Sequence, residues 1–348
     1  MKRIVICADG TWNRPEQNPR KDFPTNVLKL ARAIAPVGDD GVPQQVFYDW
    51  GIGSYHDEFI AGATGRGLHK NIMDDYRYIV QNYAPGDEIH LFGFSRGAYT
   101  IRCLCGLINN CGIVTRPDAE LIQQAFDHYK KSSKPWAPGG DKAIAFRERH
   151  AHPDRDVHFV GVWDTVGAMG IPISFLGLFE DSDEFYDTKI GRNVHIARHA
   201  LAIDEHRDDF RPTVWQPREG MDMQQVWFAG AHSNVGGSYA PDKDGTALSD
   251  NALKWMIQHA NDAGLTVEDH LPARVRPNPT ATVHDSRRSF YRLKGRHYRD
   301  LDHGKGPVLI HESVKQRWDA DSDYRPPNLK EYIDNHGWPD NVIHEDPD

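Results

Sequence analysis

The chain has 348 residues, of which 39% are hydrophobic and 26% are charged, and it carries a net charge of −9 at pH 7. This composition is typical of a soluble globular protein, and the length allows one large α/β domain or two smaller ones. The negative charge argues against nucleic acid as a partner, because binding to phosphate backbones needs a basic surface. The net negative charge is compatible with peripheral contact with a membrane, since a local basic patch could still exist.

The N-terminal residues have the pattern of a first β-strand rather than of a signal peptide. Lys2 and Arg3 are followed by only five apolar residues, at positions 4–8, which is too short for the apolar part of a signal. No stretch approaches the ~20 apolar residues of a membrane-spanning helix. We therefore expect a cytoplasmic protein, or one exported without a cleaved signal peptide.

Short apolar runs alternate with helical patterns along the chain. Strands are predicted at residues 3–8, 45–48, 88–94, 157–163 and 225–229, and helices after Thr25 up to Pro36, at 68–83, and from Ser249 to Gly264. This alternation favours a mostly parallel sheet covered by helices on both faces, an α/β-hydrolase-like fold.

Two segments interrupt the alternation and are possible lids or insertions, at residues 112–155 and 169–190. The second begins with an apolar run, for which ordinary packing against the domain is the alternative to a lid or an acyl-chain surface. Residues 270–348 lack strong periodicity and have no obvious linker before them. We expect them to wrap the same domain, so that residues 1–348 form one unit.

The four cysteines, Cys7, Cys103, Cys105 and Cys111, give no disulfide framework. Cys7 lies in a predicted strand, and the others lie in or near the helix predicted after residue 97. We expect all four to be small buried hydrophobic side chains.

The most informative stretch is Gly93-Phe94-Ser95-Arg96-Gly97, between a predicted strand and a helix-compatible run. Gly-x-Ser-x-Gly in this position is the layout of a nucleophile elbow, a sharp turn that presents a serine hydroxyl above a sheet. The two glycines are needed because the neighbouring chain comes too close for a Cβ. The stretch predicts Ser95 as a nucleophile; the alternative is a structural turn with an exposed serine.

A serine hydroxyl becomes a good nucleophile when a base takes its proton, and an acid must orient that base. In α/β-hydrolases these residues follow in the order Ser, Asp or Glu, His, each at the end of a strand. Asp164 and His232 follow two of the apolar runs in this order. Asp164 could instead cap a turn, and His232 could be an incidental loop residue, with His284 as a second candidate base.

Catalysis at an ester also needs N–H donors for the developing oxyanion. One is expected from the backbone of Arg96, directly after the candidate nucleophile. The other is expected from the loop after the first strand, where Gly10 and Thr11 are the candidates. A capping turn is the alternative interpretation of this loop.

Several ordered motifs resemble the DUF2235 family, an α/β-hydrolase group related to the Tle1 phospholipase effectors of bacterial type VI secretion. They are residues 9–13 (DGTWN), 86–88 (GDE), 93–98 (GFSRGA), 161–167 (GVWDTVG), 199–205 (HALAIDE), 232–237 (HSNVGG), 313–314 (SV) and 324–329 (YRPPNL). The resemblance thus extends over nearly the whole chain.

The resemblance implies a Ser–Asp–His hydrolase acting on esters, with phospholipids as substrates of the effector members and export of the kind that effectors use. By motif, Ser95 is the nucleophile, Asp164 the acid and His232 the base. Two positions depart from the family pattern HSDVGGGY: Asn234 stands in place of the Asp, and Ser238 in place of a Gly. If that Asp orients the histidine or binds an ion, this chain lacks the function.

The leading hypothesis is a serine hydrolase that cleaves carboxylic esters through an acyl-enzyme, with a small-molecule or lipid ester as substrate and no cofactor or metal. One alternative is a non-catalytic binding module on the same fold. Another is a metal-dependent phosphoesterase using Asp9, Asp164 and His232, although no metal-ligand spacing is evident.

Overall fold

The structure is a computed structural model that describes all residues except 19, 52–64, 132, 167–189, 288–294, 305 and 345–348. The expected loop at 169–190 therefore lies almost entirely outside the described residues. The strands are β1 (Arg3–Ala8), β2 (Gln44–Asp49), β3 (Glu88–Phe94), β4 (Val157–Trp163), β5 (Val194–Ala202), β6 (Asp222–Phe228), β7 (Leu309–His311) and β8 (Val342–Ile343). The α-helices are α1 (Asn26–Ala31), α2 (Gly65–Asn82), α3 (Arg96–Cys111), α4 (Ala119–Tyr129), α5 (Asp141–His150), α6 (His232–Gly236), α7 (Ser249–Asp262), α8 (Glu312–Ala320) and α9 (Pro327–His336), with short 3₁₀ turns η2 (Lys134–Trp136), η6 (Asp208–Phe210) and η7 (Pro272–Arg274).

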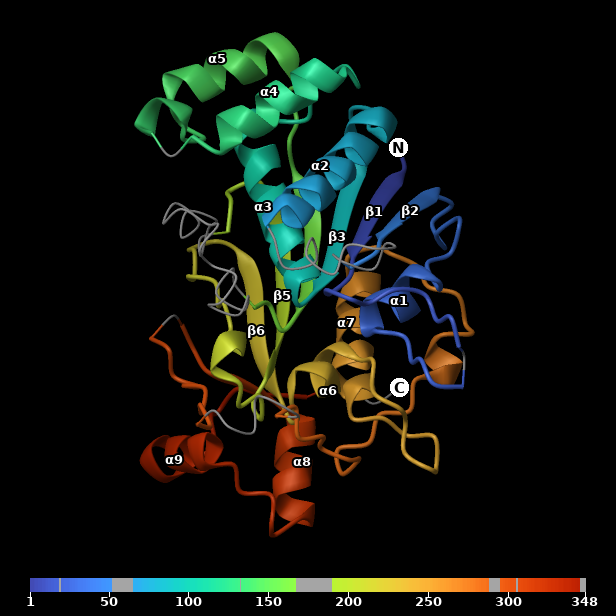
Figure 1. The fold of residues 1–348 in the computed structure, drawn as a ribbon, viewed down its shortest axis with the longest axis vertical. Helices are drawn as coiled ribbons and strands as arrows, with labels where there is room; N and C mark the ends of the chain where they lie inside the picture. The colour runs from blue at the N-terminus through green and yellow to red at the C-terminus, as the bar shows by residue number, and fades with distance from the viewer. Residues whose placement is uncertain are drawn as a thin grey trace.

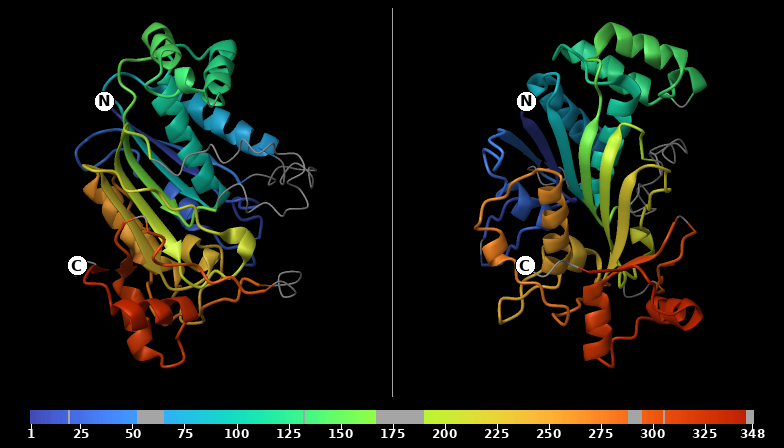
Figure 2. Two further views of the ribbon diagram at one scale, coloured as in Figure 1. Left: turned by 90° about the vertical axis from the view of Figure 1, so that its left-hand side faces the viewer. Right: turned by 180° about the vertical axis from the view of Figure 1, so that it is seen from behind.

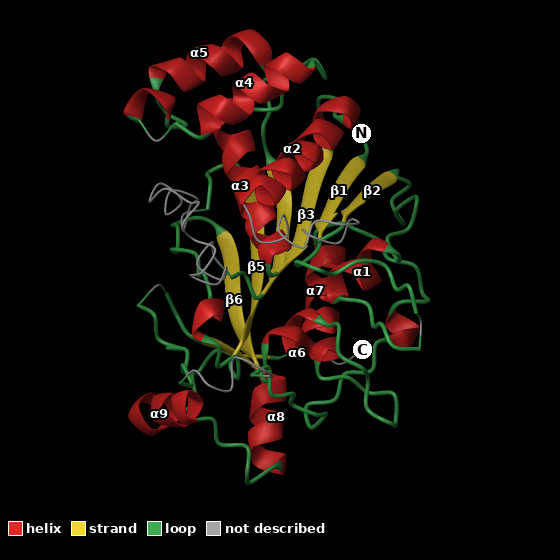
Figure 3. Ribbon diagram, in the orientation of Figure 1, coloured by secondary structure: helices red, strands yellow, loops and turns green. Residues whose placement is uncertain are grey.

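In the described part of the chain, the strands form one 8-stranded sheet in the order β2-β1-β3-β4-β5-β6-β7-β8, and each neighbouring pair is parallel (Figure 3). The chain adds β2 on one side of β1 and all later strands on the other side. Their carboxyl ends all lie at one edge, where open α/β sheets build their sites. The expected fold class, a parallel sheet of the α/β-hydrolase type flanked by helices, is confirmed.

Helices cover both faces of the sheet (Figures 1 and 2). Ile4 and Ile6 of β1 belong to the core shared with α2 and α3, whereas Val5 and Cys7 belong to the core shared with α1 and α7. This alternation follows from the two-residue period of a strand. All four cysteines are buried and free, as expected. No helix among the described residues has both the length and the apolar character needed to cross a bilayer.

The predicted helix starts and strand positions agree with the structure for most elements. Thr25 caps α1, because its hydroxyl accepts the Leu28 N–H at 3.1 Å. The strand β5 was not expected, since His195, Arg198 and His199 interrupt its apolar pattern. Arg198 is accommodated by a bidentate ion pair with Asp222 at the start of β6, with N···O distances of 2.7 and 3.0 Å.

The helices α4 and α5, within residues 112–155, lie at the end of the molecule where the strands begin (Figure 1). They pack near the C-terminal half of α3, whereas Ser95 precedes the first residue of α3. A helix of 16 residues is roughly 24 Å long at 1.5 Å per residue. The lid role suggested for this segment stays a prediction that its placement, remote from Ser95, does not favour.

The C-terminal residues add β7 and β8 to the edge of the sheet beside β6, and α8 and α9 lie beyond the carboxyl ends of the strands (Figure 1). Asn328 donates from its side-chain amide to the Ile203 carbonyl at 3.2 Å and to the Arg299 carbonyl at 3.0 Å. This segment therefore contacts the central strands directly. The division of the chain into one domain stays a prediction.

Candidate active site

Ser95, Asp164 and His232 each follow the carboxyl end of a strand, β3, β4 and β6 respectively. The strands β3 and β4 are neighbours, and the Ser95 N–H donates to the Trp163 carbonyl, next to Asp164, at 3.1 Å. Phe94, immediately before Ser95, packs against the His232 ring with a centroid separation of 4.5 Å. The fold thus brings the three predicted residues to one region of the sheet edge.

Ser95 occupies a strained turn between β3 and α3, with φ 59° and ψ −122°. This combination of backbone angles is unfavourable for an L-residue, and residues that adopt it are found mostly at functional positions. The two flanking glycines are required sterically. A Cβ on Gly97 would lie 2.1 Å from the Ala8 carbonyl oxygen, and one on Gly93 would lie 2.7 Å from Ala98 backbone atoms.

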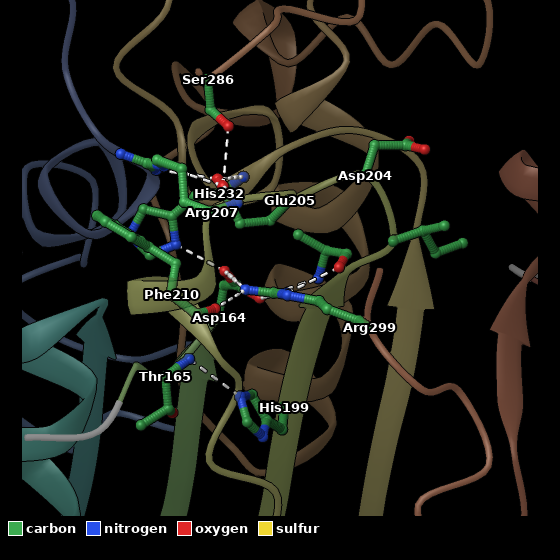
Figure 4. Close-up of polar contacts among 12 residues, drawn as sticks. Asp164, Thr165, His199, Asp204, Glu205, Arg207, Phe210, His232, Ser286 and Arg299 are labelled. Carbon is green, nitrogen blue, oxygen red and sulfur yellow. Dashed lines mark hydrogen bonds and ion pairs between the residues drawn. The ribbon is translucent and has the colours of Figure 1, made fainter. Parts of the chain in front are cut away.

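Asp164 and His232 form a buried hydrogen bond of 2.6 Å between the carboxylate Oδ2 and Nδ1 of the imidazole (Figure 4). The same carboxylate accepts two bonds from Arg299, at 2.6 Å to Oδ1 and 3.0 Å to Oδ2, and a third from the Ala202 N–H at 2.9 Å. Arg299 also donates to the Ala202 and Phe210 carbonyls. Asp164 is therefore held in one orientation by donors on every side.

The protonation states of this pair follow from burial and charge. Burial alone would raise the pKa of Asp164, but the Arg299 guanidinium and the bond to His232 hold that pKa well below its usual range. Burial lowers the pKa of His232 below 6.5, against the opposing effect of Asp164. At neutral pH the pair is a carboxylate and a neutral imidazole, whose Nε2 can accept a proton.

The backbone of His232 is positioned by Glu205, a fully buried residue after β5. Its carboxylate accepts the His232 N–H at 3.3 Å, the Ser286 hydroxyl at 2.8 Å, and a bidentate pair of bonds from the Arg207 side chain at 2.9 Å each (Figure 4). Burial would raise the pKa of Glu205, but the Arg207 bonds lower it to about 2. Glu205 is thus an anion that connects the histidine turn to the 3₁₀ turn η6.

His199 of β5 supports the loop that carries Asp164. Its Nε2 accepts the Thr165 N–H at 3.1 Å, and its Nδ1 lies 3.3 Å from Gln225 Oε1 (Figure 4). Burial lowers the pKa of His199 to about 3, so the ring is neutral. An acceptor at Nε2 requires the proton on Nδ1, which then donates to Gln225.

Of the three candidate oxyanion donors, the Gly10 amide is engaged, because it donates to Asp9 Oδ1 at 2.7 Å. Gly10 instead provides space, since a Cβ on it would lie 3.0 Å from Ser95 Cβ. Thr11 follows Gly10, and Arg96 opens α3 directly after Ser95. The Thr11 and Arg96 amides stay predicted oxyanion donors.

Asn234, one of the two departures from the family pattern, holds a neighbouring segment rather than the histidine side chain. Its Oδ1 accepts the His284 N–H at 3.0 Å, and its Nδ2 donates to the Thr282 carbonyl at 3.1 Å. His284, the second candidate base, lies 3.2 Å from Asn234 Nδ2 and stacks on Tyr239. Among the described residues, no contact joins His284 to Asp164.

We expect Asn234→Asp to lower the free energy of unfolding by about 1–3 kcal/mol, because an ionised carboxylate cannot donate to the Thr282 carbonyl. Esterase activity is expected to change less than about threefold. Urea unfolding and p-nitrophenyl ester hydrolysis measure the two effects. A tenfold change in activity at unchanged stability would show that this position acts on the reaction instead.

Ser238, the second departure, has φ 81°. Glycine adopts this conformation without steric cost, whereas serine is strained in it. The substitution therefore preserves the backbone turn at a cost in local energy.

The residues of the metal-dependent alternative do not form a ligand set for a cation. Asp9 accepts bonds from Gly10, from the Thr25 hydroxyl at 2.6 Å and from the Tyr48 hydroxyl at 2.6 Å. Burial raises the pKa of Asp9 to about 6, although these bonds oppose the shift. Asp164 is already bound by Arg299. The oxygens of both carboxylates are thus already engaged by protein donors, whereas a divalent ion requires open carboxylate oxygens.

Sequence reasoning missed Arg299, the strongest partner of Asp164. It lies in the stretch 296–299, which matches none of the motifs and has no periodic pattern. His199 was noted only as part of a family motif. No signal in a single sequence indicates that a residue 135 positions later will pair with Asp164.

The model of the family "T6SS, Phospholipase effector Tle1-like, catalytic domain" matches residues 2–259. The match covers well over half of the chain, and the protein belongs to this family. An uncharacterized protein of Saccharomyces cerevisiae is 27% identical over 238 residues, which are 62% of this chain and 33% of that protein. The chain thus spans about a third of the length of this relative.

Two solved structures resemble the chain at low identity. One is an uncharacterized protein from Pseudomonas aeruginosa, with 16% identity, a TM-score of 0.46, and coverage of 80% of this chain and 49% of the other. The second is the Tle1 effector bound to the VgrG spike of the type 6 secretion system, with 19% identity, a TM-score of 0.38, and coverage of 69% and 52%.

Proposed function

We propose that the protein is a serine hydrolase that cleaves carboxylic esters, with phospholipid acyl esters as the natural substrate class. The observation that carries the proposal is the buried 2.6 Å bond between Asp164 and His232, beside the strained turn of Ser95. Membership of a family described as a phospholipase effector catalytic domain supports the lipid substrate. Export as an effector and peripheral membrane contact belong to the same proposal.

In the proposed reaction, Ser95 Oγ attacks the ester carbonyl while His232 Nε2 takes the hydroxyl proton. His232 then gives this proton to the leaving alcohol, and an acyl-enzyme forms on Ser95. Water activated by the same imidazole releases the acid and restores the serine. Asp164 keeps the proton on Nδ1 of His232 and stabilises the imidazolium, and the Thr11 and Arg96 amides are the proposed oxyanion donors.

A fluorophosphonate probe tests the nucleophile, because it reacts with activated serines and leaves ordinary ones unlabelled. We expect one covalent adduct on folded wild-type protein, located at Ser95 by peptide mass spectrometry. Hydrolysis of p-nitrophenyl esters of increasing chain length beside phosphatidylcholine vesicles then defines the substrate. Folded protein that takes up no probe would favour the non-catalytic binding module.

The pH dependence of the reaction follows from the shifted pKa of His232. A protonated imidazole cannot accept the Ser95 proton, so kcat/KM falls as the pH falls through the pKa of His232. Because burial places that pKa below 6.5, we expect a constant rate above pH 7 and an acid limb with a midpoint under 6.5. Initial rates between pH 4.5 and 8.5 measure this; a midpoint at pH 7 or above would contradict the assignment.

A further inference from the structure

A cluster of potential metal ligands lies at the opposite edge of the sheet from Ser95, where β3 and β4 begin. Its members are Glu88 and His90 of β3 and His158 of β4, and each offers a ligand atom within 4.8 Å of the others. His90 of β3 precedes Ser95, which directly follows this strand, by five positions, or roughly 16 Å at about 3.3 Å per residue. This cluster is therefore separate from the candidate active site.

His90 is the unusual member of the cluster. Its side chain is 0% exposed, and neither ring nitrogen has a hydrogen-bond partner in the part of the chain that the structure describes. The nearest charged group, the Glu88 carboxylate, lies 3.8 Å from Nε2, which is beyond hydrogen-bonding distance. A buried imidazole without partners is costly, and native proteins seldom leave such groups unsatisfied.

We propose that Glu88, His90 and His158 bind a divalent transition-metal ion of the zinc type, with a structural role. Two imidazoles and one carboxylate are typical protein ligands of Zn²⁺, and water can complete a four-coordinate site. The His90 and His158 rings already lie close, with centroids 5.2 Å apart. The ion would link the first residues of two neighbouring strands, β3 and β4.

The ligand atoms of the three side chains need to move only a short distance toward one another to bind the ion. Ligand atoms around a tetrahedral zinc lie about 3.3 Å apart when the metal–ligand bonds are about 2.0–2.1 Å. Glu88 and His158 are partly exposed, so their side chains can rotate toward the buried His90 without disturbing the core. Their exposure also gives an ion a path from solvent.

Arg3 lies beside the cluster, and its charge must be compatible with a cation. Its Nε donates to Glu88 Oε2 at 2.8 Å, and the same oxygen lies 3.8 Å from His90 Nε2. A carboxylate oxygen has two lone pairs, so Oε2 can accept from Arg3 and still face an ion. The two terminal nitrogens of Arg3 pair with Asp40, so two carboxylates share its positive charge. Arg3 would thus orient the Glu88 carboxylate, as hydrogen-bonded neighbours of metal ligands commonly do.

The test uses untagged, full-length protein freed of metal by dialysis against a chelator. We expect isothermal titration with ZnCl₂ to show a site of micromolar or tighter Kd, and Co²⁺ to give the visible absorption of a four-coordinate complex. Zn²⁺ at 100-fold excess over Kd should raise Tm by several degrees. Absence of binding at 100 μM Zn²⁺ would overturn the proposal.

Variants assign any binding to this cluster, because the chain has 19 histidines. His158→Gln and Glu88→Gln are expected to weaken Zn²⁺ binding at least tenfold, and His90→Phe, which keeps a buried ring, to abolish it. His195→Gln is the matched control, since its ring lies 6.1 Å from that of His158 outside the cluster. Equal binding by wild type and His158→Gln would place the ion elsewhere and refute the site.

Discussion

Replacing Ser95 by alanine is expected to lower kcat/KM for p-nitrophenyl esters by at least ~10³-fold and to abolish fluorophosphonate labelling. Removal of a catalytic nucleophile commonly costs about 10⁶-fold, with residual activity from binding and oxyanion stabilisation alone. The substitution removes one oxygen, and alanine, which is also an L-residue with a Cβ, must adopt the same backbone conformation in the turn. We therefore expect the free energy of unfolding to stay within about 1 kcal/mol of the wild-type value.

The matched control is Ser249→Ala, because Ser249 and Ser95 are both 7% exposed and Ser249, on α7, is outside the proposed triad. This variant should keep wild-type turnover and labelling. Circular dichroism and urea unfolding on all three proteins separate loss of chemistry from loss of structure. Turnover by folded Ser95→Ala equal to that of wild type would refute the serine mechanism.

The fold was largely predictable, because strands buried on both faces of a parallel sheet appear as short apolar runs. The strands at 3–8, 88–94 and 157–163 have the predicted bounds. The pattern failed at β5, where Arg198 and His199 occupy strand positions and are satisfied by partners on β6. It also failed at β7 and β8, since strands of 3 and 2 residues are too short to show a period.

The candidate site was predictable to the extent that strand ends determine it. In a parallel sheet, residues that follow different strands meet at one edge, which makes Ser95, Asp164 and His232 candidates. The resemblance to the DUF2235 motifs then selects Asp164 and His232 over the alternatives. Hydrogen-bond partners could not be predicted in the same way, because they depend on the paths of the loops. That Gly10 donates to Asp9, and that Asn234 binds the Thr282 carbonyl, could not be foreseen from spacing.

Arg299 gives the second large expected effect, because it neutralises a fully buried carboxylate. Truncation to Met would leave Asp164 with only His232 and the Ala202 N–H as donors. Breaking a buried ion pair by removing one partner typically destabilises a protein by 3–5 kcal/mol. We expect Arg299→Met to lower the free energy of unfolding by about that amount.

The same substitution should also reduce kcat about 100-fold with KM nearly unchanged. Arg299 does not belong to the proposed reacting groups; it positions Asp164, and a shift of about 1 Å in a catalytic group can cost this factor. Loss of the guanidinium also removes the charge that keeps the pKa of Asp164 low. Arg299→Lys, which keeps the charge but not the bidentate geometry, is expected to recover part of both losses.

A double variant distinguishes positioning from general stability. Asp164→Asn combined with Arg299→Met removes both charges, so the free energy of unfolding should return to within about 2 kcal/mol of wild type. Activity should stay about 10⁴-fold low, because an amide no longer holds the His232 tautomer. If Arg299→Met alone is as stable and as active as wild type, the ion pair between Arg299 and Asp164 contributes neither to stability nor to activity. If the double variant recovers activity together with stability, Asp164 does not act on His232, and the proposed triad is wrong.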